Sequence, residues 1–145
     1  MTEIKIGGRT VPLFYSTYEM IAIQNEIGCT AFQLRDEVFG IVQENEDDPM
    51  SIGFTVAREP AKTAKLGTLL RILGNAGLEE KGETGDLTDK WILRNMKPPL
   101  IIAYAIAAMA EINEGNKIES PVKEEEQGPV DEILEAEQAK KQPGN

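Results

Sequence analysis

The side chains best suited to nucleophilic catalysis are the single cysteine, Cys29, and the three serines, Ser16, Ser51 and Ser120. A serine or cysteine nucleophile needs an adjacent base, and the sequence contains no histidine. A Ser–Lys pair stays open, although no motif points to one. No basic residue flanks Cys29 to lower its pKa, and a small buried residue suits its position between Gly28 and Thr30. We therefore expect a protein that is not an enzyme.

Metal and cofactor sites are equally hard to build from these residues. One cysteine without histidine cannot form a structural zinc site or an internal disulfide. The acidic run 44–49 lacks the alternating oxygen ligands, central glycine and closing glutamate of a calcium loop. The glycine pairs at 7–8 and 74–77 lack the spacing of a phosphate or dinucleotide loop. We expect no metal and no cofactor.

The net charge of −10 bears on which partners the chain binds. Such a surface repels phosphate backbones, and no basic stripe offsets it, so we expect no nucleic-acid binding. The longest apolar stretch, 100–110, has eleven residues, whereas a membrane span needs roughly 20. No signal peptide is recognisable at the N-terminus. We expect a protein of the cytoplasm with no membrane partner.

The first elements of the chain are predicted by turn and cap residues. Alternating apolar residues over 2–15, interrupted by Gly7-Gly8, predict a β-hairpin. Ser16 and Glu19 form a capping box, so a helix should follow and end before Gly28. Thr30 predicts a second helix over 31–42, and 44–49 should form an acidic loop.

Three further helices follow from apolar spacing. Leu66, Leu69, Leu70 and Leu73 form the strongest amphipathic stripe, in a helix over 61–76 that Gly77 should end. Thr88 begins a helix that Pro98-Pro99 interrupts. The last helix, 100–114, is apolar almost all round, so either its own domain or another subunit of a homo-oligomer must cover it.

The composition changes near residue 119. The segment 119–145 is rich in acids and has no aromatic residue, which predicts a disordered acidic tail. Within it, the spacing of Val130, Ile133 and Leu134 suits one or two helical turns formed against a partner, or else a fraying stretch with incidental apolar residues. The expected fold class is therefore mainly α (α+β), with a globular domain at 1–118, a short N-terminal β-hairpin, about five helices and a tail.

Several segments together resemble one family. These are Ile4 to Leu13, Tyr15 to Met20 with Glu26-Ile27-Gly28 after it, the helix end at 70–78, and the region from Thr88 to Pro98 with its alanine-rich successor. In order of elements, residues 1–118 resemble the tail assembly chaperones of long-tailed bacteriophages and prophages. An acidic tail is also typical of that family.

The resemblance implies a chaperone that binds the tape measure protein, a long helical chain, and keeps it soluble during tail assembly. The tail tube protein is a further candidate partner, and the chaperone is absent from the mature virion. Candidate partner-binding residues are the leucine stripe, if part of it is exposed, and the tail residues: Leu66, Leu69, Leu73, Val130, Ile133 and Leu134.

Two other functions remain open on the sequence. An acidic inhibitor or DNA mimic of a host nucleic-acid enzyme would account for the charge. That function would need carboxylates arrayed on one face, whereas half of the net charge lies in the tail. A small structural protein of the head–tail connection or tail completion would stay in the virion.

Overall fold

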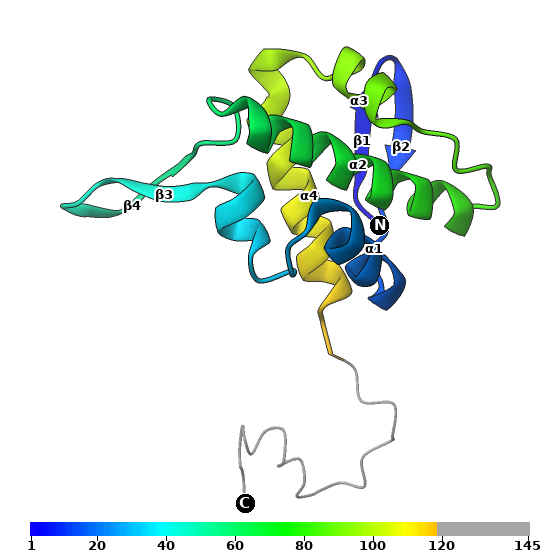
Figure 1. Ribbon diagram of the computed structural model, residues 1–145, viewed down its shortest axis with the longest axis horizontal. Helices are drawn as coiled ribbons and strands as arrows, with labels where there is room; N and C mark the ends of the chain where they lie inside the picture. Colours follow the sequence, from blue (N-terminus) through cyan, green and yellow to red (C-terminus); the bar gives the residue numbers. More distant parts are fainter. Residues whose placement is uncertain (119–145) are drawn as a thin grey trace, which may run out of the picture.

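The computed structural model describes residues 1–118, and these form a mainly helical fold with a short antiparallel hairpin at the N-terminus. The predicted tail, including Val130, Ile133 and Leu134, lies outside the described residues. The α-helices are α1 (Thr17–Ile27), α2 (Pro60–Glu80), α3 (Asp89–Asn95) and α4 (Ile101–Gly115). Figure 1 shows α2 crossing α4, and the two helices pack against each other.

The N-terminal hairpin consists of β1 (Glu3–Ile6) and β2 (Arg9–Pro12). Gly7 and Gly8 both have positive φ, as a tight two-residue turn requires. Ile4, Ile6 and Val11 face the core. The hairpin prediction is confirmed. Within residues 1–118, β2 pairs only with β1, so Pro12 costs no inter-strand hydrogen bond with a third strand there.

The cap predictions for α1 are confirmed. The Ser16 amide donates to Glu19 Oε1 at 2.9 Å, and Gly28 ends the helix in the left-handed conformation. Glu19 and Ile23 are buried, whereas Tyr18 and Ile21 are exposed.

The predicted helix over 31–42 is wrong. Thr30 does exchange hydrogen bonds with Gln33, but only a π-helical turn, η1 (Arg35–Phe39), follows. Gly40 then adopts a φ of 60° and ends the turn. The chain continues into a second antiparallel hairpin, β3 (Ile41–Asn45) and β4 (Asp48–Phe54), which the sequence reading missed.

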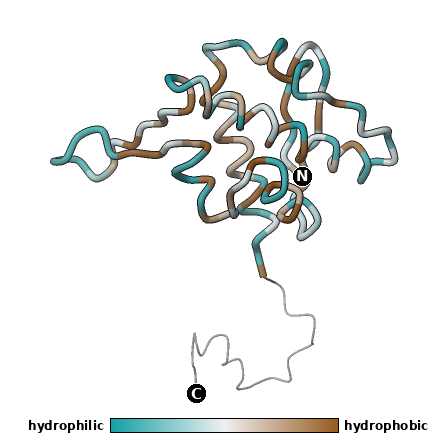
Figure 2. Tube along the Cα trace, viewed as in Figure 1, coloured by the Kyte–Doolittle hydropathy of each residue, from teal (hydrophilic) through white to brown (hydrophobic). Residues whose placement is uncertain are grey.

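The second hairpin has the predicted acidic run at its turn. It extends from the helical body, on the left in Figure 1, and its tip is hydrophilic (Figure 2). In β4 the large apolar residues Met50, Ile52 and Phe54 stand at every second position, separated by the small residues Ser51 and Gly53. That alternation was the available signal for a strand.

The long helix α2 forms the centre of the core. It passes through Gly77, which was expected to end it, and continues to Glu80. A Cβ atom at Gly77 would lie 2.0 Å from the carbonyl oxygen of Pro12. Gly77 therefore lets strand β2 approach the helix closely, instead of ending it.

The last helix joins both ends of the described chain. After the 3-10 turn η2 (Pro98–Leu100), α4 runs to Gly115 and packs on α2 and β1. The Tyr104 hydroxyl donates to the Lys5 carbonyl oxygen at 2.7 Å, and the Thr2 amide donates to Glu111 Oε1 at 2.7 Å. These contacts fix which side of α4 faces the core and which side is left open.

Candidate partner-binding surface

The open side of α4 is apolar. Ile102 and Ile106 are 38% and 51% exposed, and Met109 is partly exposed. With Asn113 they follow spacings of four, three and four residues, so they form one stripe along the helix. No charged residue occurs between Ile101 and Ala110. We call Ile102, Ile106, Met109 and Asn113 the α4 stripe.

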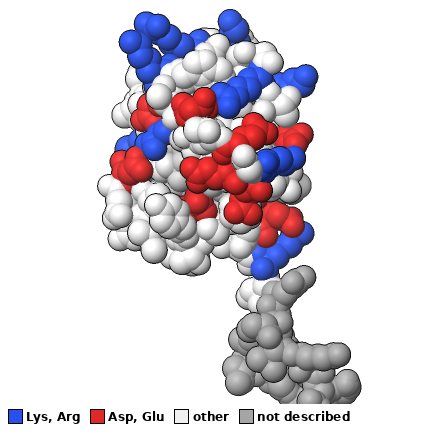
Figure 3. Space-filling model, turned by 90° about the vertical axis from the view of Figure 1, so that its right-hand side faces the viewer, with Lys and Arg blue, Asp and Glu red and all other residues white. Residues whose placement is uncertain are grey.

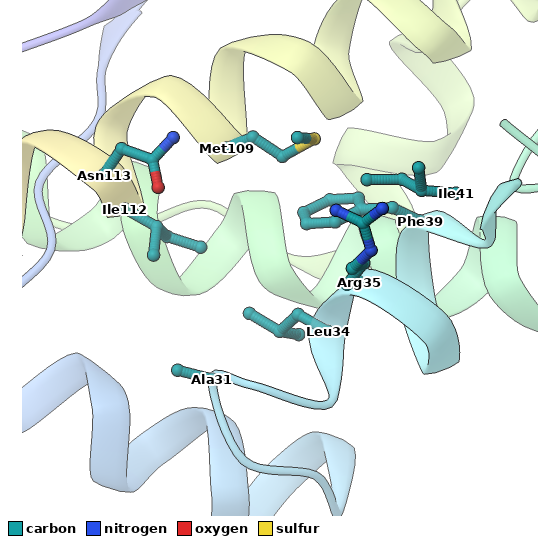
Figure 4. Close-up of a pocket in the computed structure, with 8 residues that line it drawn as sticks. All are labelled: Ala31, Leu34, Arg35, Phe39, Ile41, Met109, Ile112 and Asn113. Carbon is teal, nitrogen blue, oxygen red and sulfur yellow. The ribbon is translucent and has the colours of Figure 1, made fainter. Parts of the chain in front are cut away.

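One end of the α4 stripe borders a hollow of about 230 Å³, shown in Figure 4. Met109 and Ile112 of α4 face Leu34 and Phe39 across it (Figure 4). The whole lining comprises Ala31, Leu34, Arg35, Phe39, Ile41, Met109, Ile112 and Asn113. We call this the α4–η1 hollow. Because its lining is mostly apolar, it suits an apolar side chain from a partner.

A second, more open depression of about 450 Å³ lies at the other end of the α4 stripe. Ile102 lines it together with residues of the second hairpin and the loop after it: Glu44, Ile52, Gly53, Phe54, Ala57 and Arg58. The α4 stripe therefore connects two depressions, with the exposed Ile106 between them. Such a run of apolar contacts has the form of a groove for an amphipathic helix.

Each depression has one arginine in its lining, Arg35 in the first and Arg58 in the second. Among residues 1–118, neither side chain forms an ion pair. The chain as a whole is strongly acidic. The second depression also has one carboxylate, Glu44, in its lining. The surface therefore offers two cations, Arg35 and Arg58, to acidic side chains that flank a partner's apolar residues.

A smaller hollow of about 190 Å³ between α1 and α2 has a more polar lining. Arg71 donates to Glu26, and its Nε donates to Asp89 Oδ1 at 2.6 Å. The Thr68 hydroxyl donates to Asp89 Oδ2 at 2.7 Å. These bonds connect α1, α2 and α3, so we interpret the network as structural.

The hydrogen bonds of this network shift the pKa values of Arg71 and Asp89. The hydrogen bond to Glu26 is the main reason that the pKa of Arg71 is raised. Burial acts to raise the pKa of Asp89, but the hydrogen bonds from Arg71 and Thr68 outweigh burial and hold that pKa below its ordinary value. Both groups are thus fixed in their charged forms.

Another side of the molecule carries many of its carboxylates. Figure 3 views the right-hand side of Figure 1 and shows acidic side chains gathered there, with lysines and arginines among and above them. Because cations interrupt the acidic side chains, this face does not present an unbroken array of carboxylates. We interpret it as a solvated surface.

The leucine stripe predicted as a partner surface lies in the core. Leu66, Leu69 and Leu73 are fully buried, so they stabilise the fold and are not available to a partner. The condition that part of the stripe be exposed is not met. The other predicted binding residues, Val130, Ile133 and Leu134, lie outside the described residues.

Sequence reasoning missed Arg35, Arg58 and the residues of the second hairpin as parts of a surface. It did single out the 100–110 helix, and α4 supplies the stripe.

Cys29 is buried as expected. Burial is the main reason that the pKa of its thiol is raised. The charge of Lys65 acts to lower this pKa, and the charge of Glu37 acts to raise it.

Residues 1–118 contain neither a metal-binding cluster nor a membrane-spanning helix. No three His, Cys, Asp or Glu side chains lie where they could hold a metal ion. None of the helices in that part of the chain is long and apolar enough to cross a membrane.

Comparison with known proteins found no relative: no family model, curated protein or solved structure matches this chain.

Proposed function

We propose that this chain is a tail assembly chaperone of a long-tailed bacteriophage, which binds the tape measure protein and keeps it soluble until the tail is built. The observation that carries the proposal is the α4 stripe, a mostly apolar and partly exposed helix face that joins two depressions. The segments that resemble the family support the same function. On this proposal the chain acts by binding and not by catalysis.

The client fits the surface chemically. A long helical protein presents apolar residues at spacings of three and four, which match a helix-shaped groove. Ile102 and Ile106 would contact that apolar side, while Arg35 and Arg58 would pair with acidic residues beside it. The net charge of −10 would keep the complex soluble.

The proposed function also specifies a cellular compartment and a set of partners. The chaperone acts in the cytoplasm of the bacterial host and leaves before the virion is complete. The tail tube protein is a further candidate partner, and a homo-oligomer would cover the same α4 stripe with a second copy. Neither nucleic acid nor a membrane takes part.

The test uses co-expression with the tape measure protein of the same phage genome. The variant Ile102→Asp with Ile106→Asp places two carboxylates in the groove, where an unpaired charge is costly to bury. We expect binding of the client to weaken about tenfold or more. Solubility of the client and co-elution in size-exclusion chromatography are measured.

The matched control is Ile21→Asp, because Ile21 is 52% exposed and Ile106 is 51% exposed, both on helices. The control should bind the client as the unmodified chain does, and all variants should melt at similar temperatures. A client that stays insoluble with the unmodified chain would refute the proposal. Recovery of the chain from purified virions by mass spectrometry would favour the structural alternative.

A further inference from the structure

The α4–η1 hollow lies at the end of α4 that leads into the C-terminal segment. Met109, Ile112 and Asn113 of its lining belong to the last two turns of the helix, which ends at Gly115. The segment 119–145 follows three residues later. The first residues of the C-terminal segment are therefore close in sequence to residues that line the hollow.

The C-terminal segment contains one group of residues with matching chemistry. Val130, Ile133 and Leu134 are spaced so that one or two helical turns would place them on one side. The acids Asp131, Glu132 and Glu135 lie between or beside them in the sequence. Arg35 in the hollow forms no ion pair within residues 1–118. The apolar residues of the segment thus match the apolar lining of the hollow, and its acidic residues match the charge of Arg35.

The chain between Ile118 and Val130 is long enough for Val130, Ile133 and Leu134 to reach the hollow. Eleven residues, 119–129, separate Ile118 from Val130. A coil of that length spans roughly 17–20 Å on average. Asn113 precedes Ile118 by only five residues. Those up to Gly115 are helical and rise about 1.5 Å each. The segment can therefore reach the hollow, and a short tether gives it an effective concentration of about millimolar.

We propose that residues 129–135 of this chain dock into its own α4–η1 hollow, with Ile133 and Leu134 as the anchors and Arg35 pairing with the flanking carboxylates. The C-terminal segment then covers one end of the α4 stripe in the free protein. Displacement of the docked segment by a client rests on the proposed function. The docking itself does not.

The test uses the full chain with two introduced cysteines, Asn113→Cys on the rim of the hollow and Ala136→Cys beside the anchors. The native Cys29 is buried and reacts little. A short bismaleimide reagent joins the pair, and mass spectrometry separates intramolecular from intermolecular products. Asn113→Cys alone controls for reaction with Cys29.

The matched control pair is Asn25→Cys with Ala136→Cys, because Asn25 is exposed on α1 and carries the same amide side chain. We expect intramolecular linking at least about fivefold faster for the Asn113 pair, since docking adds to the effect of the tether. Adding Ile133→Asp with Leu134→Asp should lower the rate to that of the control.

Equal rates for the two pairs, or no effect of the aspartate substitutions, would overturn the docking. A linked dimer as the main product would also overturn it, because the occupant would then be the tail of a second copy. The cross-linking assay contains no client. Docking can therefore be refuted while client binding is confirmed, and client binding can be refuted while docking is confirmed.

Discussion

Asp89 is the residue at which charge and fold are most directly coupled. Its pKa is lowered in the folded chain because the hydrogen bonds from Arg71 and Thr68 outweigh burial. A carboxyl group with a lowered folded pKa stabilises the fold above its unfolded pKa of about 3.9, and this contribution is lost as pH falls through the folded pKa. The network therefore contributes at neutral pH and not in strong acid.

We predict that Asp89→Asn lowers the free energy of unfolding at pH 7 by about 1 kcal/mol, a modest value because the carboxylate is 44% exposed and screened by solvent. The difference from the unmodified chain should vanish below the folded pKa. Urea unfolding at several pH values measures this. Asp86→Asn, in the exposed pair with Arg9, is the control and should change little. A pH-independent loss would contradict the prediction.

At the scale of elements, Gly77 determines how closely helix α2 and strand β2 pack. Alanine favours a helix over glycine by about 1 kcal/mol, but a Cβ at Gly77 would meet the Pro12 carbonyl oxygen at 2.0 Å. Backbone atoms cannot move aside as a side chain can. We predict that Gly77→Ala destabilises the fold by about 1–3 kcal/mol, measured as a shift of the urea midpoint.

Gly67→Ala is the matched control in the same helix. The atoms nearest to its added Cβ would be Cδ2 and Cγ of Leu93, at 2.6 and 2.9 Å, in a side chain that is exposed and can rotate away. This control should be close to neutral, since the helix gains propensity where the packing yields. Equal losses for both variants would show that helix packing on β2 is not the reason.

At the scale of the whole molecule, Glu111 connects the two ends of the described chain. It is 3% exposed, and its Oε1 accepts from the Thr2 amide at 2.7 Å. Hydrogen bonds to charged groups contribute about 1.5–3 kcal/mol, and removal would leave the partly buried Thr2 amide without its acceptor. We predict that Glu111→Ala lowers the free energy of unfolding by about this amount.

Glu114→Ala is the control for that prediction. Glu114 lies one turn later, and its one ion pair within residues 1–118 is with the exposed Lys117, so its loss should cost less than about 0.5 kcal/mol. Differential scanning calorimetry of both variants measures the comparison. A Glu114 effect as large as that of Glu111 would mean that helix charge, and not the link to the N-terminus, is responsible.

The sequence by itself determined the features that depend on neighbouring residues. The Gly7-Gly8 turn, the Ser16–Glu19 capping box and the Gly28 helix end were predicted correctly. Each rests on hydrogen bonds and φ angles within a few residues, so it needs no knowledge of the rest of the chain. The mainly helical class with an N-terminal hairpin followed from the same signals.

Only the tertiary structure decided the features that depend on distant contacts. Residues 41–54 form a hairpin because β3 pairs with β4 after Gly40 turns the chain. The leucines of α2 are buried, and Ile102 and Ile106 of α4 are exposed, because β1, β2 and α1 cover some helix faces and leave one open. Spacing shows that a helix has an apolar face, but which face is buried depends on which elements pack against it.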